Sequence, residues 1–597
     1  YRRAYYSWKQ NEAENLKKEK GAHSSRIYYD MVNRLANSFA KNGEVLYLPH
    51  NMDFRGRVYP AVSFLSHQNE DLVRSLMMFW DAKPLGETGY DWLVYQLANL
   101  YNKSKTTMEQ LKLFVETHKS SIIGSAQDPL AENAWWLKAD NPWQVLALCH
   151  EFDAIWKHPH DLASYRSRIP VHQDGSCNGL QHYSALGADE KAARAVNVLP
   201  GDTMQDVYTT VLGLVEKRVS NNIDSKTENE REFARLAQSF LSRKLIKQTV
   251  MTTVYGVTPY GATQQVKKRI EEMTENVLEN SLLGAEKLRL AGYISGHVLE
   301  SISDLFAGAE LIQNWLVDCC SRCIQAYDPR DFPEPDKIDF FGKNHYRPMM
   351  WTSLSGFPVI QMYRKRAIRE LRTPLQKLIL RDDLRLAPID ELKLKNGIAP
   401  NFIHSIDAIH LLMTCLSANS EGLTFAAVHD SFWTHASEVE RLSEIIREEF
   451  ARLHSSDIIA SLQQDMAHVN RNSFQLVWVN VEKNTEFVAE LNRLREKTVG
   501  KGPILGQSRL NEVLRSEIHE NLQVNALVET YKPQLLWVSR SAGPPIIYDD
   551  CALSKTVLEK VSPKTHVPLL VPVKLRQAPE VGTLDIQAVL QSKYFFS

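Results

Sequence analysis

The sequence has no apolar run of the roughly 18–20 residues that are needed to cross a bilayer. We therefore expect neither a membrane-spanning protein nor membrane insertion. An excess of charge of either sign is also absent, because 70 Lys and Arg are balanced by 71 Asp and Glu, which leaves a net charge of −1. A protein that binds nucleic acid usually carries a basic footprint. Such a function would therefore require basic residues that are unevenly distributed.

Two segments do carry a local excess of basic residues. Residues 1–60 hold 11 Lys and Arg against 6 Asp and Glu, and residues 364–385 hold 8 against 3. Without further context, each segment is equally well explained as the solvated face of a helix.

Cysteine is scarce, and its spacing argues against a zinc site. Among seven cysteines there is one C-x-x-C, Cys320 to Cys323, with no second pair or nearby histidine to complete a metal site. This usage is typical of reduced thiols in an intracellular compartment. The chain begins at Tyr1 without a visible targeting segment, so we expect it to be the C-terminal part of a longer protein. Its 597 residues predict roughly four domains of average size.

Two aspartates each follow a short β-rich stretch. Asp174 follows Ile169-Pro170-Val171 and opens DGSCNGLQHYSALG, whereas Asp430 lies in VHDSFW. If the two strand ends are neighbours, the carboxylates could share a pair of divalent cations, which is the apparatus of in-line phosphoryl transfer. The alternative is that each aspartate caps a turn, and for either residue alone that simpler interpretation is favoured.

A basic segment, RKLIKQTVMTTVYG, predicts a helix that begins at Arg243. Lys247, Met251 and Tyr255 follow at intervals of four residues and would lie with Arg243 along one face. Gly256 would end or kink the helix. Such a face suits a nucleoside triphosphate, with cations for the phosphates and a hydroxyl near the sugar. A solvated basic helix with a buried tyrosine is the alternative.

Together these segments resemble the catalytic motifs of the single-subunit, bacteriophage-type DNA-directed RNA polymerases, and most closely the mitochondrial branch of fungal type. The two aspartate segments are similar to the two palm motifs, and the basic helix is similar to the fingers motif. Four further segments match in family order: PHNMDFRGRVYP (49–60), AVNVLPGDTMQDVY (195–208), NGIAPNFIHSIDAIHLL (396–412) and SKYFFS (592–597). Seven ordered segments are far more specific than any single motif.

The resemblance implies a helix-rich α+β fold shaped as a right hand, with an antiparallel palm sheet and mainly helical fingers and thumb. Four divisions are expected along the chain: the end of the thumb (1–42), the first part of the palm (43–190), the fingers (191–404) and the second part of the palm (405–597). Within the last division, residues 473–580 are predicted to form an irregular insertion of unassigned role.

The resemblance also implies that an RNA 3′-hydroxyl attacks the α-phosphate of a ribonucleoside triphosphate and releases pyrophosphate. Asp174 and Asp430 would hold two Mg²⁺ ions, with the Gly175 carbonyl as a further ligand. Arg243 and Lys247 would neutralise the pyrophosphate, and Lys247 would donate the proton to the leaving group.

Matching positions imply further contacts to the incoming nucleotide. Tyr255 would select ribose over deoxyribose, because its phenol can hydrogen-bond the 2′-hydroxyl. His404 would lie near the same sugar and the terminal base pair, or else be a satisfied buried histidine at a helix start. Lys105 and Tyr208 would also contact the incoming nucleotide.

Nucleic-acid contacts are expected from Arg55, Arg57 and Gly256. For the two arginines, a local salt bridge with Asp53 is an equally good explanation. The C-terminal Phe595-Phe596-Ser597 resembles the aromatic tail that packs beside the active site in this family.

A polymerase of this type would bind a DNA template, nascent RNA and ribonucleoside triphosphates. It would be a monomeric catalytic subunit of the mitochondrial matrix and would work with an accessory transcription initiation factor. One alternative is a family-A-type DNA polymerase, which would normally carry a non-selective residue such as phenylalanine near Tyr255. Another is an inactive polymerase fold that only binds nucleic acid, against which the intact set of Asp174, Asp430, Lys247 and Tyr255 argues.

Overall fold

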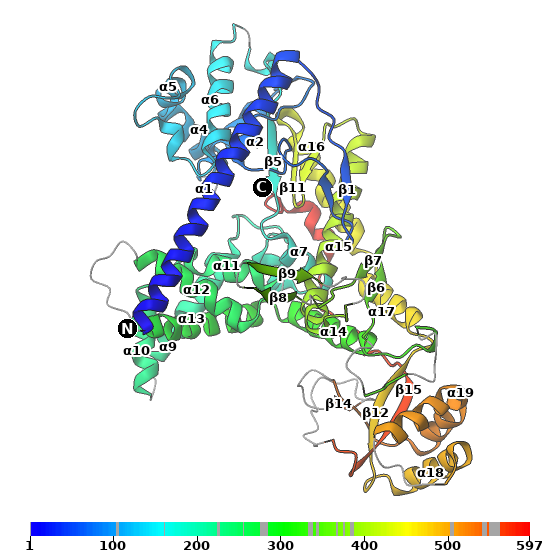
Figure 1. Cartoon of the computed structure of the whole chain (residues 1–597). Helices are drawn as coiled ribbons and strands as arrows, with labels where there is room; N and C mark the ends of the chain where they lie inside the picture. The colour runs from blue at the N-terminus through cyan, green and yellow to red at the C-terminus, as the bar shows by residue number, and fades with distance from the viewer. Residues whose placement is uncertain are drawn as a thin grey trace.

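Helices dominate the structure, and its strands form small antiparallel sheets (Figure 1). This confirms the predicted helix-rich α+β class. The computed structural model describes residues 2–102, 107–159, 161–223, 227–254, 256–274, 284–331, 338–341, 346–365, 368–373, 376–381, 387–501, 507–539, 546–547 and 561–596. Within this part of the chain, no helix is both long enough and apolar enough to cross a membrane.

The first helix, α1 (Arg2–Asn42), is 41 residues long and coincides with the segment predicted to end the thumb. Its C-terminal half is tied to the chain that follows it: the Tyr28 hydroxyl accepts from Asn69 Nδ2 at 3.1 Å, and Tyr29 donates to Glu70 at 3.1 Å. A cavity of about 1180 Å³ lies between this half of the helix and residues 65–80. Figure 1 shows the helix crossing the molecule from the N terminus to the level of α2 (Asp71–Ser75).

A three-stranded sheet, predicted to be that of the palm and called the palm sheet below, joins strands that are far apart in the sequence. Its order is β10-β11-β5, with β5 (Pro170–Asp174) in the first half of the chain and β10 (Ala426–Val428) and β11 (Ser431–His435) in the second. Both pairings are antiparallel. Val171 of β5 packs in one apolar cluster with α3 (Gly89–Leu100) and α6 (Pro142–Lys157). The helices thereby hold β5, an edge strand of this sheet, in place.

A second and larger core lies among the helices that surround the site. These helices share the buried cluster that also contains Phe432 of the palm and Phe595 of the C-terminal tail. They are α7 (Asn178–Leu186), α9 (Val207–Asn222), α11 (Arg243–Thr253), α12 (Pro259–Thr274), α13 (Gly284–Leu305), α14 (Ala307–Ile324), α15 (Glu391–Ser420) and α16 (Val439–His454).

Helix α11 forms as the sequence predicts. Ser242 caps its N-terminus, because the Ser242 hydroxyl accepts from Leu245 N–H at 3.3 Å. Leu245 and Val250 are buried in the core, whereas Lys247 on the other face is exposed. The helix ends at Thr253, and Gly256 follows with a φ of +68°, a left-handed conformation that favours glycine.

The described residues of the basic segment 364–385 form no helix. Its described residues build a hairpin of β8 (Ile368–Arg372) and β9 (Lys377–Arg381), which follows the smaller hairpin of β6 (Met349–Thr352) and β7 (Pro358–Gln361). The interpretation of this segment as a solvated helix face is therefore wrong. Three of the four residues from Lys377 to Leu380 are apolar and consecutive. This pattern is typical of a strand and does not follow the spacing of an amphipathic helix.

The prediction of an irregular insertion over residues 473–580 is wrong for its described part, which is a regular sheet covered by helices. Its sheet has the order β14-β13-β12-β15, is antiparallel throughout, and lies at the end of the molecule farthest from α6 (Figure 1). The elements are β12 (Phe474–Asn480), α18 (Thr485–Val499), α19 (Gln507–Tyr531), β13 (Leu535–Trp537), β14 (Ile546–Ile547) and β15 (His566–Pro572). The long stretch between β12 and β15 concealed their pairing.

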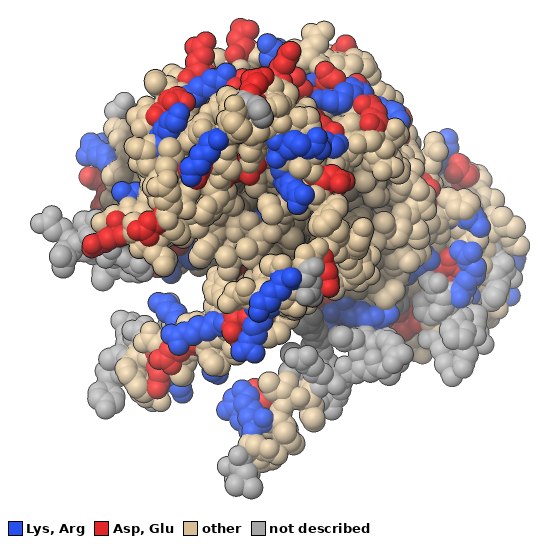
Figure 2. All heavy atoms as spheres, turned by 90° about the horizontal axis from the view of Figure 1, so that it is seen from above, with Lys and Arg blue, Asp and Glu red and all other residues tan. Residues whose placement is uncertain are grey.

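Short elements complete the described chain. They are β1 (His50–Met52), β2 (Val58–Pro60), β3 (Lys83–Pro84), α4 (Met108–Thr117), α5 (Lys119–Gln127), β4 (Arg166–Ser167), α8 (Glu190–Ala195), α10 (Glu228–Gln238) and α17 (Ile458–Val469). Figure 2 shows Lys and Arg interspersed with Asp and Glu on the face seen from above, in keeping with the net charge of −1. The assignment of these elements to thumb, palm and fingers stays a prediction.

Gly179 provides a test of how α7 packs on α11. A Cβ at Gly179 would lie 2.4 Å from Cγ1 of Val254, the C-cap residue directly after α11. We expect Gly179→Ala to lower the free energy of unfolding by about 1–3 kcal/mol, because Val254 is buried and its branched side chain cannot easily move aside. Chemical denaturation would measure the change.

The matched control is Gly213→Ala in α9, where the added Cβ meets no atom within 4 Å. This control should be neutral or slightly stabilising, since alanine is favoured over glycine within a helix. Equal stabilities for the two variants would contradict the described contact between α7 and α11.

Candidate active site

Pairing of β5 with β11 brings Asp174 and Asp430 together. Asp174 lies opposite Ser431 in the antiparallel register, so Asp430 is the residue directly before its partner. One step further, the Gly175 N–H donates to the Asp430 carbonyl at 3.2 Å. The expectation that the two strand ends are neighbours is confirmed.

The electrostatics of this pair favour a cation. Asp174 is reached by solvent yet is enclosed by protein on most sides, and burial raises its pKa, with the charge of Asp430 raising it further. Burial likewise raises the pKa of Asp430, while Arg57 opposes that shift. Two carboxylates that repel each other are stabilised in their charged form by any cation placed between them.

The donor set fits Mg²⁺ better than a metal that needs a complete cage of side chains. No cluster of three or more His, Cys, Asp or Glu that could hold a metal occurs within the described ranges. Mg²⁺ is commonly held by one or two carboxylates together with water and substrate phosphates. Asp174 and Asp430 supply the carboxylates, and Gly175 follows Asp174 directly, with its N–H bonded to the Asp430 carbonyl.

Arg57 links the loop between β1 and β2 to α15. Its Nε donates to Asp407 Oδ1 at 3.0 Å, and its Nη2 contacts the second carboxylate oxygen. Burial raises the pKa of Asp407 to about 6 although Arg57 opposes the shift, and the charge of Asp430 adds to it. The ion pair therefore places a buried cation close to the aspartates. Asp407 was not singled out from the sequence, although it lies in the matched segment 396–412.

Arg55 makes both a local and a distant contact. It forms the expected salt bridge with Asp53, with Nη2 to Oδ2 at 2.6 Å, and its Nη1 lies 2.7 Å from Nδ1 of His404. Burial, reinforced by Arg57 and Arg55, lowers the pKa of His404 to about 2. The imidazole is therefore neutral, with Nδ1 as acceptor and the proton on Nε2. His404 lies inside α15 rather than at a helix start.

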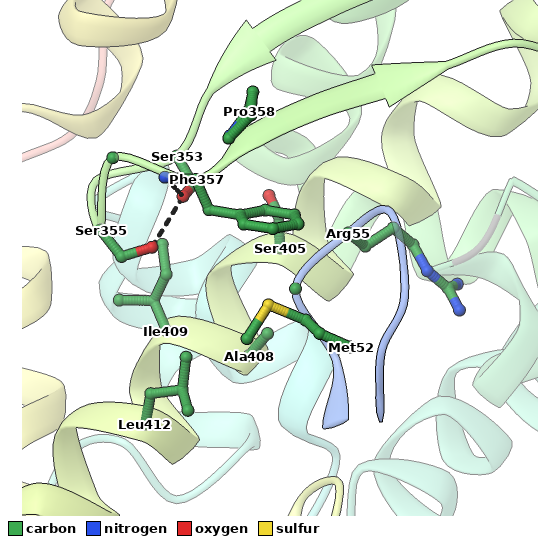
Figure 3. Close-up of a pocket in the computed structure, with 12 residues that line it drawn as sticks. Met52, Arg55, Ser353, Ser355, Phe357, Pro358, Ser405, Ala408, Ile409 and Leu412 are labelled. Carbon is green, nitrogen blue, oxygen red and sulfur yellow. Dashed lines mark hydrogen bonds between the residues drawn. The ribbon is translucent and has the colours of Figure 1, made fainter. Parts of the chain in front are cut away.

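A cavity of about 350 Å³ lies behind the Arg55–Gly56 turn. Figure 3 shows residues from this turn, from α15 and from the β6–β7 turn around it, with the Arg55 guanidinium pointing away from the cavity. The two serine hydroxyls at its edge, Ser353 and Ser355, bond each other at 2.9 Å. Because apolar side chains such as Ile409 and Leu412 form much of its wall, this space separates packed elements and offers little for phosphate chemistry.

The cationic face of α11 meets the aspartates through Tyr208. The Arg243 guanidinium lies 5.0 Å and the Lys247 ammonium 5.8 Å from the centre of the Tyr208 ring. The Tyr208 hydroxyl in turn interacts with the thiol of Cys177, three residues after Asp174, and burial raises the pKa of both groups. The structure therefore brings together Arg243, Lys247 and Tyr208, three residues predicted for the site. They lie beyond the end of β5 that carries Asp174.

Asp206 is a residue of this face that sequence reasoning missed. Arg243 donates to it through Nε at 2.7 Å and through Nη2 at 3.2 Å, and this hydrogen bonding raises the pKa of Arg243. Asp206 lies in the matched segment 195–208, two residues before Tyr208, but its spacing carries no signal of the pair. The Asp206 carboxylate orients the guanidinium, and phosphate oxygens could accept the same hydrogen bonds from it.

Two predicted site residues lie outside the described residues. They are Lys105 and Tyr255, and their roles stay predictions. Gly256 is described and has a left-handed backbone conformation. A Cβ added at Gly256 would lie 3.7 Å from the Asn396 carbonyl oxygen of α15.

The aromatic tail packs beside the site as expected. Phe596 forms a β-bridge with Gly175 and stacks on Phe432 of β11, with ring centres 5.4 Å apart. The carbonyl of Phe595 accepts from Gln181 at 2.8 Å. The tail thereby fixes the backbone of Gly175 next to the two aspartates.

Three buried histidines lie behind the palm sheet. His182 and His454 share a hydrogen bond of 2.8 Å, and His410 bonds the Ile446 carbonyl at 3.0 Å. Burial lowers the pKa of His410 to about 4 and that of His454 to about 3, and it holds the pKa of His182 well below the usual range. All three imidazoles are neutral in the fold at physiological pH.

Comparison with known proteins gives a consistent result. A family model described as DNA-dependent RNA polymerase matches residues 83–597. The mitochondrial DNA-directed RNA polymerase of Neurospora crassa is 37% identical over 534 residues, which cover 84% of this chain and 37% of the relative. That of Schizosaccharomyces pombe is 39% identical, covering 74% and 37%, and that of Mus musculus is 36% identical, covering 84% and 39%. The chain thus spans about four tenths of the length of these relatives.

The histidine cluster predicts how stability depends on pH. Unfolded imidazoles take up protons near pH 6.5, whereas the folded ones resist protonation until about pH 4 or 3. We therefore expect the free energy of unfolding to be level above about pH 7 and to fall below about pH 6.5, by up to roughly 1.4 kcal/mol per pH unit for each histidine. Asp407, with its raised pKa of about 6, acts in the opposite direction, as do Asp174 and Asp430, whose pKa values burial also raises. The buried histidines outnumber these carboxylates, because burial also lowers the pKa of His172 and His404.

Chemical denaturation between pH 5 and pH 8 measures this slope. His454→Gln should flatten it, whatever its effect on absolute stability, and His468→Gln on the exposed surface should leave it unchanged. A stability that rises from pH 7 to pH 5 would contradict the account.

Proposed function

The chain belongs to the DNA-dependent RNA polymerase family, and we propose that it synthesises RNA on a DNA template from ribonucleoside triphosphates in the mitochondrial matrix. One observation carries this proposal: Asp174 and Asp430 lie side by side, with the cations of α11 on the strand-end side. The mitochondrial relatives support the compartment.

In this reaction Asp174, Asp430 and the Gly175 carbonyl would hold two Mg²⁺ ions. Bound Mg²⁺ would lower the pKa of the attacking 3′-hydroxyl and offset charge on the leaving oxygen. Arg243 would exchange its bonds to Asp206 for bonds to the triphosphate. Lys247 would neutralise the pyrophosphate and donate a proton to it, because its ammonium lies on the same face of the helix.

The remaining contacts follow the same arrangement. Tyr208 and Lys105 would border the incoming nucleotide, Tyr255 would read its 2′-hydroxyl, and neutral His404 would offer its Nε2 proton to the sugar or the terminal base pair. Gly256, Arg55 and Arg57 would face the nucleic acid. Arg57 is held by Asp407 and Arg55 by Asp53, so these two would act mainly by shaping the loop.

We further propose a monomeric catalytic subunit that binds a DNA template and nascent RNA and is assisted by an accessory initiation factor. Helix α1 would end the thumb, residues 43–190 and 405–597 would form the palm, and residues 191–404 the fingers. The sheet of β12, β13, β14 and β15 would be an appended part of the palm.

The two-metal role can be tested with Asp174→Asn and Asp430→Asn. Each should lower the rate of RNA primer extension on a DNA template by at least roughly a thousandfold, since an amide is a weak Mg²⁺ ligand. Asp304→Asn is the matched control and should extend at the native rate, because the Asp304 side chain on α13 is 61% exposed. Native rates for either palm variant would remove the assignment.

Sugar selection can be tested with Tyr255→Phe. Loss of the hydroxyl should raise incorporation of deoxyribonucleotides relative to ribonucleotides by roughly tenfold or more, while ribonucleotide extension persists. Tyr260→Phe is the control, because Tyr260 is 75% exposed at the start of α12. An unchanged sugar preference would take Tyr255 out of this role, and a native preference for deoxyribonucleotides would favour a DNA polymerase instead.

A further inference from the structure

One cation beside the palm sheet takes no part in the chemistry described above. Arg74 of α2 lies with its guanidinium 5.8 Å from the centre of the Trp433 ring and is half-buried there. Its Nε donates to the Asn69 carbonyl at 2.9 Å. Among the residues that the structure describes, its two terminal nitrogens have no hydrogen-bond acceptor.

The position of Arg74 relative to Asp174 follows from the strand register. Trp433 lies opposite His172 and stacks on it, with ring centres 4.0 Å apart. His172 and Asp174 are two residues apart on β5, so their side chains leave the same face roughly 7 Å apart. Arg74 therefore lies over the face that carries Asp174, one pair back from the strand end. Arg74 and Asp174 also attract each other electrostatically, without a hydrogen bond between them.

Arg74 is held in its orientation by its surroundings. The Asn69 that accepts from its Nε is itself anchored, because Asn69 Nδ2 donates to the Tyr28 hydroxyl of α1 at 3.1 Å. Trp433, below the guanidinium, donates from Nε1 to the Ser431 hydroxyl at 2.8 Å. A guanidinium whose Nε is engaged and whose terminal nitrogens have no acceptor among the described residues is preorganised for an anion.

The anion can be identified from the direction of the reaction. In-line phosphoryl transfer places the attacking oxygen and the leaving group on opposite sides of the phosphorus. Arg243 and Lys247 lie beyond the strand end, next to Tyr208 and Cys177, where the pyrophosphate would leave. Arg74 lies on the other side of Asp174, back along the strand. The RNA strand that carries the attacking 3′-hydroxyl must therefore approach from the side of Asp174 on which Arg74 lies.

We propose that Arg74 binds a backbone phosphate of the RNA strand close to its 3′ end and so places the 3′-hydroxyl at Asp174. This inference rests on the proposed function, and it adds a substrate contact on the side opposite the nucleoside triphosphate. Through Asn69 and Tyr28, the same contact is connected to α1, so the grip on the RNA and the position of that helix are linked.

The test is extension of an RNA primer on a DNA template by the whole chain, with either ordinary or methylphosphonate linkages at the two 3′-terminal positions. A methylphosphonate removes the phosphate charge without shortening the strand. For the wild-type chain we expect neutral linkages to raise the KM for the primer roughly tenfold to a hundredfold, the size of a charge-assisted hydrogen bond.

Arg74→Gln should already show the raised KM with an ordinary primer, and neutral linkages should have little additional effect on it. Arg74→Lys should restore part of the affinity, and the KM for the nucleotide and the Mg²⁺ dependence should match the wild type. Arg168→Gln is the matched control, because Arg168 likewise lies over a tryptophan, 5.7 Å from the ring of Trp80, but is exposed.

The proposal would be overturned if neutral linkages raised the KM of Arg74→Gln for the primer as much as they raise that of the wild type. It would also be overturned if the variant changed the Mg²⁺ dependence or the KM for the nucleotide instead, because Arg74 would then act on Asp174 itself. A wild-type chain that extends no primer at all would contradict the proposed function, and is thereby distinguished from failure of this contact alone.

Discussion

The antiparallel pairing of β5 with β11 is the constraint on which the rest of the site depends. It joins segments separated by more than 250 residues, and its register sets Asp174 opposite Ser431 and beside Asp430. A slip of one residue would turn every side chain of β5 to the opposite face of the sheet. The register is secured by side chains, because Trp433 stacks on His172 and the tail residue Phe596 stacks on Phe432.

Charge around this pairing is arranged locally, which explains how a chain with a net charge of −1 can present a site for polyanions. The cations near the aspartates are oriented by partners: Arg57 by Asp407, and Arg243 by Asp206. The first pair is buried and would be costly to separate, since an unpaired charge would remain in the interior. Arg243 is about one-third exposed, so exchange of its carboxylate for a phosphate is far easier there.

The sequence predicted the parts of the site that depend on local pattern. The four-residue spacing in α11 placed Arg243 and Lys247 on one face, and the β-rich stretches before Asp174 and Asp430 became adjacent strands. The residues that it missed are partners brought by long-range contact. Asp206, Asp407 and Arg74 acquire their roles only when separate elements meet, and no spacing within one segment encodes that meeting.

Secondary structure was hardest to predict where the strands of a sheet are far apart in the sequence. In the segment 473–580, β12 and β15 pair over seven residues but are separated by two helices and by breaks rich in glycine and proline. The hairpin of β8 and β9 was hidden for a different reason: its basic residues suit an exposed strand and an exposed helix equally well. In both cases the partner strand supplies the information that local composition lacks.

The central claim is that Asp174 and Asp430 hold the same metal ions, and localised backbone cleavage tests it most directly. Fe²⁺ can take the place of Mg²⁺ at carboxylate sites, and with ascorbate and peroxide it generates hydroxyl radicals that cut the nearest backbone. We expect cuts next to both Asp174 and Asp430, which excess Mg²⁺ suppresses together and which are lost together in Asp174→Asn. Cleavage near one aspartate alone, or in a part of the chain remote from both, would contradict it.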